Sequence, residues 1–297
     1  MTKPKLHLSL FNHGVGARSL QDMRHFLLDG LQGLGYDVTW GERLETGRLN
    51  ILWEYFSEDF SRRLLDSNVE YAIIATEVPH KRPESGALLL NNRSDLDWPL
   101  RSSQLPKVLE KAQFVWSLDP RPESLAVWRE YAPTSYLGVG YSPSLHAAMK
   151  EVDIEPDLDF AFTGVPTDYR VSILNELRKK TALGYQPGLL TFEQRNIMLR
   201  RAKCNLALRL DKDWPLPSYT RIMSLLHAER LAISDVTPWC SAPADLVPQI
   251  EPEALARDPY GVLSAPFPHT PSEALQQLAD TRPAVRVVAE AWEGLTR

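Results

Sequence analysis

Two stretches in the second half of the sequence combine features that bind anions. In the first, DFAFTGVPTDYR, a predicted strand ends at Thr163, Gly164 permits close backbone approach, and Arg170 lies in the first turn of the next helix. The free N–H groups of a helix N-terminus favour an anion, and arginine adds a planar, permanently charged donor fork. A phosphate group is therefore expected here. The alternative is that Gly164 only makes a tight turn and that Arg170 is a solvated surface charge.

The second stretch is RLDKDWPLPSYTR, which overlaps the end of the apolar strand CNLALRL. This strand ends near Arg209, and an irregular segment with two prolines leads to a helix that we expect to begin at Ser218. Serine is a favourable N-cap residue, and the first turn of the helix carries Tyr219 and Arg221. A plain capped helix with an exposed arginine would also explain this stretch. Two helix N-termini that both follow strands favour a diphosphate ligand.

The charge distribution bears on the kind of partner. Residues 168–203 include eight basic and three acidic side chains, although the whole chain has a formal net charge of −5 and a pI of about 5.9. Some of the basic residues must be solvated, because Arg178, Lys179 and Lys180 are consecutive and cannot all point one way on a helix. Coating nucleic acid requires a net basic surface, so no nucleic-acid partner is expected.

The first half of the chain offers candidates for proton transfer. His13 lies in the loop after the first predicted strand, and its unperturbed pKa near 6.5 suits abstraction of a proton from a hydroxyl group. The alternative for His13 is a ligand contact or a helix cap. Glu77 ends the apolar strand YAIIATEVP, where a carboxylate is either a site residue or the partner of a neighbouring arginine, and we favour the site. Glu54 and Asp119 hold comparable positions and are reserve candidates.

Alternating strands and helices must position these residues. Short apolar runs alternate with helical patterns, and strands that are apolar on both faces indicate a parallel sheet covered on both sides. Between residues 142 and 156 the alternation weakens, and we place a domain boundary there. The sequence predicts an α/β fold with two tandem Rossmann-like lobes, residues 1–150 and 151–297, whose parallel sheets face a central cleft. Ligands of open α/β sheets bind at the carboxyl ends of the strands, so the cleft is the expected ligand position.

Composition and missing motifs exclude other classes. With 43% hydrophobic and 24% charged residues the chain of 297 residues is globular. The full G-x-G-x-x-G spacing, the P-loop and the G-x-S-x-G elbow are all absent from the sequence. The only cysteines, Cys204 and Cys240, indicate neither a disulfide framework nor a zinc site. Because we see no apolar run of membrane-helix length and no signal peptide, we expect a soluble, cytoplasmic protein.

The order of elements after residue 158 resembles the donor-binding half of GT-B fold glycosyltransferases. The resemblance rests on an F-x-G turn at Gly164, the helix-borne Arg170, a strand ending in Arg209, the S-x-x-R sequence that ends at Arg221, and the strand LAISD. It covers residues 158–290 and is greatest to the CgeB-like branch (glycosyl transferases group 1), whereas the first lobe is similar in topology only.

This resemblance implies a glycosyltransferase that moves a sugar from a nucleotide-sugar donor to a saccharide, glycan or protein acceptor, as in polysaccharide biosynthesis. The second lobe, residues 151–297, would bind the donor through Gly164, Arg170, Arg209, Ser218, Tyr219 and Arg221. The first lobe, residues 1–150, would bind the acceptor, with His13 or Glu77 as the base if the anomeric centre is inverted. No cofactor other than the nucleotide sugar and no metal are expected, since the DKD sequence at residues 211–213 lies in a loop.

The sequence departs from the family pattern at one position. Many GT-B enzymes bind the donor ribose through an acidic residue near the start of the helix after S-x-x-R, but Ile222, Met223 and Ser224 stand here and Glu229 follows later. The identity of the nucleotide is therefore not predicted. Two other functions stay open: a non-catalytic two-lobed binding protein or pseudo-glycosyltransferase subunit, and a nucleotide-sugar epimerase.

Overall fold

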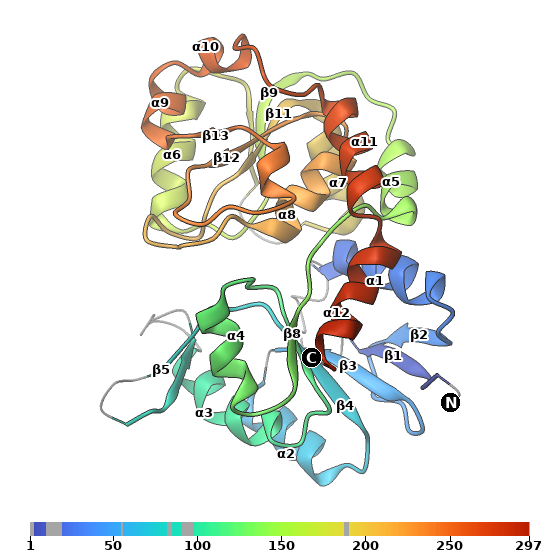
Figure 1. Ribbon diagram of the computed structural model, residues 1–297. Helices are drawn as coiled ribbons and strands as arrows, with labels where there is room; N and C mark the ends of the chain where they lie inside the picture. The colour runs from blue at the N-terminus through green and yellow to red at the C-terminus, as the bar shows by residue number, and fades with distance from the viewer. Residues whose placement is uncertain are drawn as a thin grey trace. The chain divides into compact units, whose positions relative to one another are not determined.

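The computed structural model describes residues 3–9, 20–54, 56–81, 85–90, 98–186 and 190–296, and it divides into two compact units (Figure 1). The first unit comprises residues 1–17, 30–138 and 285–297, and the second comprises residues 18–29 and 139–284. The units therefore differ from the continuous halves 1–150 and 151–297. Residues 18–29, near the start of the chain, belong to the second unit, and residues 285–297, at its end, belong to the first. The acceptor and donor roles expected of the halves stay predictions.

The first unit is built on a six-stranded parallel sheet with the strand order β2-β1-β3-β4-β7-β8. Its strands are β1 (Leu6–Ser9), β2 (Val38–Gly41), β3 (Leu49–Trp53), β4 (Tyr71–Ala75), β7 (Val115–Ser117) and β8 (Thr134–Tyr136). Every residue of β1, β3 and β4 is buried. Such strands are covered on both faces, which explains why they are continuous apolar runs instead of alternating ones. A short antiparallel hairpin, β5 (Pro79–Lys81) and β6 (Leu88–Leu90), follows β4.

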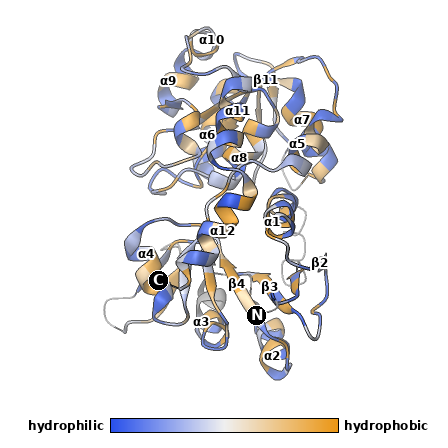
Figure 2. Cartoon of the chain, turned by 45° about the vertical axis from the view of Figure 1, so that its right-hand side comes forward, coloured by the Kyte–Doolittle hydropathy of each residue, from blue (hydrophilic) through white to orange (hydrophobic). Residues whose placement is uncertain are grey.

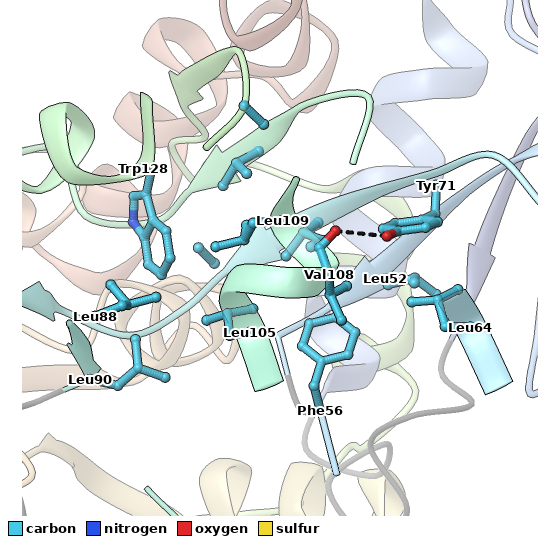
Figure 3. Close-up of a cluster of buried hydrophobic side chains, with 14 of the residues drawn as sticks. Leu52, Phe56, Leu64, Tyr71, Leu88, Leu90, Leu105, Val108, Leu109 and Trp128 are labelled. Carbon is cyan, nitrogen blue, oxygen red and sulfur yellow. Dashed lines mark hydrogen bonds between the residues drawn. The ribbon is translucent and has the colours of Figure 1, made fainter. Parts of the chain in front are cut away.

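Helices cover both faces of this sheet. The helices of this unit are α2 (Glu58–Asp66), α3 (Trp98–Leu109), α4 (Pro122–Arg129) and α12 (Ala284–Gly294), together with the last turn of α1 (Gln21–Gly33), whose earlier residues belong to the second unit. Side chains of α2, α3 and α4 form one core cluster with the sheet, in which the Tyr71 hydroxyl donates to the backbone oxygen of Val108 at 2.7 Å (Figure 3). On the other face Trp292 of α12 packs against Trp116 of β7, with ring centroids 5.0 Å apart.

The second unit has a five-stranded parallel sheet with the order β10-β9-β11-β12-β13. Its strands are β9 (Leu158–Phe162), β10 (Leu183–Gly184), β11 (Ala202–Ala207), β12 (Leu231–Asp235) and β13 (Gln249–Ile250). Its helices are α5 (Pro143–Lys150), α6 (Asp168–Arg178), α7 (Phe192–Arg201), α8 (Tyr219–His227), α9 (Pro252–Arg257), α10 (Pro259–Leu263) and α11 (Pro271–Thr281), with a short 3-10 turn η2 (Ala244–Leu246). The helices carry hydrophobic and hydrophilic residues together, as expected for helices that cover a sheet (Figure 2).

The fold class predicted from the sequence is confirmed: the chain is α/β, with two units that each contain a parallel sheet. In the described residues no helix is long and apolar enough to cross a membrane.

Candidate functional site

Three neighbouring strands of the second unit bring the predicted donor residues to one edge of the sheet. Strands β9, β11 and β12 are adjacent and parallel, so their carboxyl ends lie at the same edge. Gly164 follows β9 by two residues, Arg209 follows β11 by two residues, and Asp235 ends β12. Because helices α6 and α8 begin after β9 and β11, their first turns carry Arg170 and Arg221 to this edge.

Arg170 is a buried residue, with 4% of its surface exposed, and is not the solvated charge of the alternative interpretation. Its guanidinium donates three hydrogen bonds to backbone oxygens, to Val165 at 3.0 Å, Leu208 at 3.0 Å and Arg209 at 2.7 Å. Burial lowers the pKa of Arg170 to about 10. The side chain is still a cation at neutral pH, and these three acceptors carry only partial negative charge.

Arg221 lies beside Arg170. It donates from Nε to the backbone oxygen of Thr163 at 3.0 Å and from Nη1 to that of Leu208 at 2.9 Å, so both arginines share one acceptor. Both guanidinium carbons also lie over the ring of Phe162, at 5.4 Å for Arg170 and 5.1 Å for Arg221. Burial, followed by the positive charge of Arg170, holds the pKa of Arg221 well below its usual value.

Gly164 allows this arrangement. A Cβ atom at this position would lie 2.6 Å from Nη2 of Arg221 and 3.0 Å from Cζ of Phe162. The close approach expected at Gly164 is thus made by the Arg221 side chain, which two backbone oxygens hold in place.

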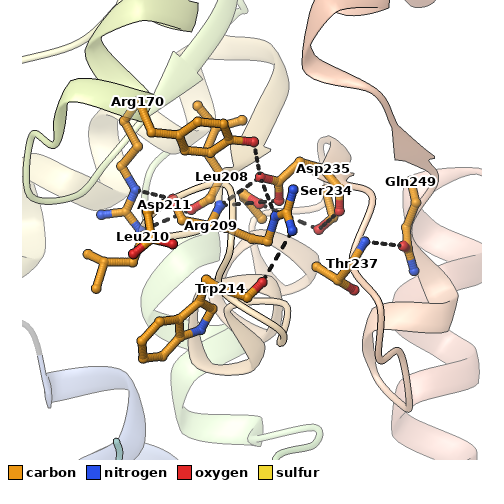
Figure 4. Close-up of polar contacts among 12 residues, drawn as sticks. Arg170, Leu208, Arg209, Leu210, Asp211, Trp214, Ser234, Asp235, Thr237 and Gln249 are labelled. Atoms are coloured by element: carbon orange, nitrogen blue, oxygen red, sulfur yellow. Dashed lines mark hydrogen bonds and ion pairs between the residues drawn. The ribbon is translucent and has the colours of Figure 1, made fainter. Parts of the chain in front are cut away.

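Arg209 differs from the other two arginines because a carboxylate neutralises it. Its Nε lies 3.2 Å from Oδ2 of Asp235, and its backbone N–H donates to the same carboxylate (Figure 4). The Tyr169 hydroxyl also donates to Asp235 at 2.8 Å, and Nη1 of Arg209 donates to the backbone oxygen of Trp214 at 3.2 Å. Within the described part of the chain, neither Arg170 nor Arg221 has a carboxylate oxygen within 4.0 Å. Hereafter we call Arg170 and Arg221 the arginine pair.

The start of helix α8 departs from the expectation in one detail. Ser218 is at the N-cap position, but its side chain makes no capping hydrogen bond. Tyr219 is buried, and its hydroxyl lies 2.9 Å from Oγ of Ser241 in the loop after β12. Tyr219 therefore fixes this loop against the first turn of α8.

In the first unit, carboxylates follow three neighbouring strands. Glu54 directly follows β3, is 1% exposed and accepts a hydrogen bond from Thr76 at 3.2 Å. Glu77 follows β4 by two residues and is partly buried. Asp119 follows β7 by two residues and accepts from Nε and Nη2 of Arg121, so it is an arginine partner. These carboxylates share the carboxyl edge of the sheet, and the roles of Glu77 and Glu54 stay predictions.

Two further expectations concern residues in loops. His13 lies outside the described residues. The Asp211 side chain of the DKD sequence accepts the backbone N–H of Asp213 at 2.9 Å, which is a local turn. Among the described residues no three His, Cys, Asp or Glu side chains are grouped so as to hold a metal ion.

Asp235 is the site residue that the sequence analysis missed. It ends the buried strand LAISD, as Glu77 follows YAIIA, so the same strand-end criterion would have found it. Asp235 pairs directly with Arg209 and acts on Arg170 and Arg221 only at longer range. No sequence pattern indicates that pairing.

Comparisons with known proteins give a fold and no closer relationship. No protein-family model matches the sequence, and no curated protein matches it. Among solved structures, the UDP-forming alpha,alpha-trehalose-phosphate synthase from Burkholderia vietnamiensis is similar over 97% of this chain and 80% of its own, with a TM-score of 0.52 and 10% sequence identity. The enzyme from Burkholderia xenovorans in complex with glucose-6-phosphate gives a TM-score of 0.52, with 9% identity, over 97% of this chain and 81% of its own. Trehalose-6-phosphate synthase OtsA gives 0.51 with 11% identity, over 93% and 76%.

The chain has a GT-B type fold. Within this GT-B fold the arginine pair lies at the carboxyl edge of the second sheet, which is the edge where open α/β sheets bind ligands.

Proposed function

We propose that this chain is a glycosyltransferase that takes a sugar from a nucleotide-sugar donor and transfers it, without a metal ion, to a hydroxyl group of an acceptor. The observation that carries the proposal is the arginine pair, two partly or fully buried cations whose side-chain hydrogen bonds in the described part of the chain go to backbone oxygens. The negative charge of Asp235 acts on both arginines and that of Asp211 on Arg170, but no carboxylate of the described residues lies within 4.0 Å of either one. Burying positive charge without such a close counter-ion costs free energy, and a bound anion would recover part of it. The similar structures include UDP-forming synthases, which supports a nucleoside diphosphate as that anion.

The role of the arginine pair in sugar transfer depends on where negative charge develops during the reaction. When the glycosyl–phosphate bond breaks, negative charge grows on the departing nucleoside diphosphate. Fixed donors aimed at that charge stabilise the transition state, and removing one such donor costs about 10²- to 10³-fold in kcat in other enzymes. Arg170 and Arg221 are held by three and two hydrogen bonds to backbone oxygens, so their positions are set before the donor binds.

The other candidate residues take supporting parts in this proposal. Asp235 holds Arg209, and Arg209 holds the loop after β11 through Trp214. Gly164 admits Arg221, whereas Ser218 and Tyr219 begin the helix that carries it. The first unit would bind a saccharide, glycan or protein acceptor, with His13 or Glu77 as the base for an inverting reaction. We place the enzyme in the cytoplasm, in polysaccharide biosynthesis, near the CgeB-like branch.

A turnover assay tests the proposal. The protein is incubated with UDP-, GDP-, CMP- and dTDP-activated sugars and a panel of saccharide acceptors, and the products are separated by chromatography. We expect free nucleotide to form together with a glycosylated acceptor. Nucleotide-sugar binding without any turnover would indicate a binding protein or pseudo-glycosyltransferase subunit. An altered sugar that is still attached to its nucleotide would indicate an epimerase.

A further inference from the structure

Trp239 is an exposed aromatic residue near the carboxyl edge of the second sheet. It follows the end of β12 by four residues, and 40% of its surface is exposed. Val236 in the same loop is 36% exposed. Leaving a large apolar ring in water forgoes the free energy of burying it, so an exposed tryptophan is available to bind a flat apolar partner.

Hydrogen bonds hold both the backbone N–H and the backbone oxygen of Trp239. The Trp239 N–H donates to the backbone oxygen of Pro215 at 3.2 Å, and its backbone oxygen accepts from the Thr237 hydroxyl at 2.8 Å. Thr237 is fixed in turn, because its N–H donates to the Gln249 side chain at 3.2 Å (Figure 4). Because the backbone is held, a ligand that binds the ring has to order only the side chain of Trp239 and not the loop.

The same loop is tied to the arginine pair. Ser241, two residues after Trp239, contacts the hydroxyl of Tyr219 at 2.9 Å, and Tyr219 shares the first turn of α8 with Arg221. The Pro215 loop that receives the Trp239 N–H also contains Trp214, which accepts from Arg209. The backbone of Trp239 is therefore linked through the Pro215 loop and Arg209 to the arginine pair at one edge of the sheet.

We propose that Trp239 forms the platform on which the base of the donor nucleotide stacks. This inference rests on the proposed function, because it takes the anion at the arginine pair to be a nucleoside diphosphate. Such a ligand has a charged end and a flat aromatic end, and the site offers matching groups for both. Stacking depends on the π-face that every base has, so Trp239 contributes affinity for nucleosides of all bases and little discrimination among them.

Two ligands separate the base from the phosphates: UDP and inorganic pyrophosphate. Binding of each is measured by calorimetry for the wild type, Trp239→Ala and Trp239→Phe. We expect Trp239→Ala to weaken UDP binding about 10- to 100-fold, to leave pyrophosphate binding within about twofold, and Trp239→Phe to retain most of the UDP affinity. Ile197→Ala is the matched control, since Ile197 is also 40% exposed but lies on helix α7.

The outcomes distinguish this inference from the function on which it rests. Two results would show that Trp239 is not the base platform while leaving the proposed function in place. In the first, Trp239→Ala binds UDP as tightly as the wild type does. In the second, Trp239→Ala loses affinity for UDP and for pyrophosphate to the same extent. If the wild type binds neither pyrophosphate nor any of UDP, GDP, CMP and dTDP in the same calorimetry, both the platform and the proposed function are overturned.

Discussion

At the scale of single residues, His227 shows how a buried hydrogen-bond pattern fixes a protonation state. Its Nδ1 donates to the backbone oxygen of Met223 at 2.7 Å, and its Nε2 accepts the backbone N–H of Ser142 at 2.9 Å. A second proton would place an N–H of the ring against the N–H of Ser142. Burial lowers the pKa of His227 to about 4, so the folded protein keeps this ring neutral.

This lowered pKa predicts a loss of stability in mild acid. Between pH 6.5 and 4 the unfolded chain binds a proton at His227 that the folded chain does not, so the free energy of unfolding falls as the pH falls. From pH 7.5 to pH 5 the wild type should lose about 2 kcal/mol more than His227→Gln. Urea titrations at the two pH values measure the difference, and other histidines cancel because both proteins contain them. Equal losses in both proteins would contradict the assignment.

The arginines show what residue type and spacing can predict. The sequence placed Arg170, Arg209 and Arg221 near one edge of a sheet, because strand ends and helix starts can be read from local patterns. It could not distinguish the arginine that pairs with Asp235 from the two that bond to backbone oxygens. That distinction depends on side-chain contacts between segments distant in sequence, such as residues 209 and 235.

For helices and strands, residue type and spacing predict where many elements begin and end. They do not predict whether a given side chain makes the hydrogen bond that its residue type allows. Thr191 and Gln194 have the residue types and spacing of a capping box, and both of its hydrogen bonds are present at the start of α7. The strand expected to end at Thr163 and the strand LAISD correspond to β9 and β12. Ser218 has the right residue type for a cap, yet its backbone ψ of 81° leaves its side chain without the capping bond.

The end of helix α8 carries a further prediction. Glu229 follows the C-cap residue Ala228 with a φ of 49°, in the left-handed region that normally favours glycine. Its carboxylate contacts Nε2 of His146 at 3.2 Å, and Nδ1 of His146 contacts the Tyr141 hydroxyl at 2.9 Å. Glu229→Gly and Glu229→Ala both lose the carboxylate, but only alanine keeps the backbone strain.

Glu229→Gly should therefore be about 1 kcal/mol more stable than Glu229→Ala. Thermal or urea unfolding of the two variants measures this difference directly. A glycine variant that is no more stable than the alanine variant would show that the left-handed conformation costs nothing at this position.

At the scale of the whole molecule, the chain does not divide into an N-terminal half and a C-terminal half. Trp292 of the last helix packs with Tyr36, Phe114 and Trp116 of the first unit. Asp22 near the N-terminus binds Arg195 and Ser224 of the second unit. Residues 18–29 belong to the second unit and residues 285–297 to the first. Hydrophobic periodicity gives no information on the sheet against which a helix packs, so a boundary drawn near residue 150 does not describe these two segments.

Arg230 provides a matched control for the arginine pair. It too donates to backbone oxygens, those of Arg200 and Ile154 at 3.0 Å each, but it immediately precedes β12 at the opposite end of that strand. Replacing it tests whether the loss of any carbonyl-bound arginine disturbs the second unit. Arg170→Lys keeps a positive charge but removes the donor fork, and Arg221→Gln removes the charge.

The most direct measurement is a calorimetric titration of UDP, in the presence of EDTA, into the wild type, Arg170→Lys, Arg221→Gln and Arg230→Gln, with folding checked by thermal unfolding. A charge-assisted hydrogen bond contributes about 1.5–3 kcal/mol. We therefore expect affinity to fall at least about tenfold in Arg170→Lys and Arg221→Gln, while Arg230→Gln stays within about twofold of the wild type. Unchanged affinity in both folded variants of the arginine pair, or binding that EDTA abolishes, would contradict a metal-independent diphosphate site built on these two arginines.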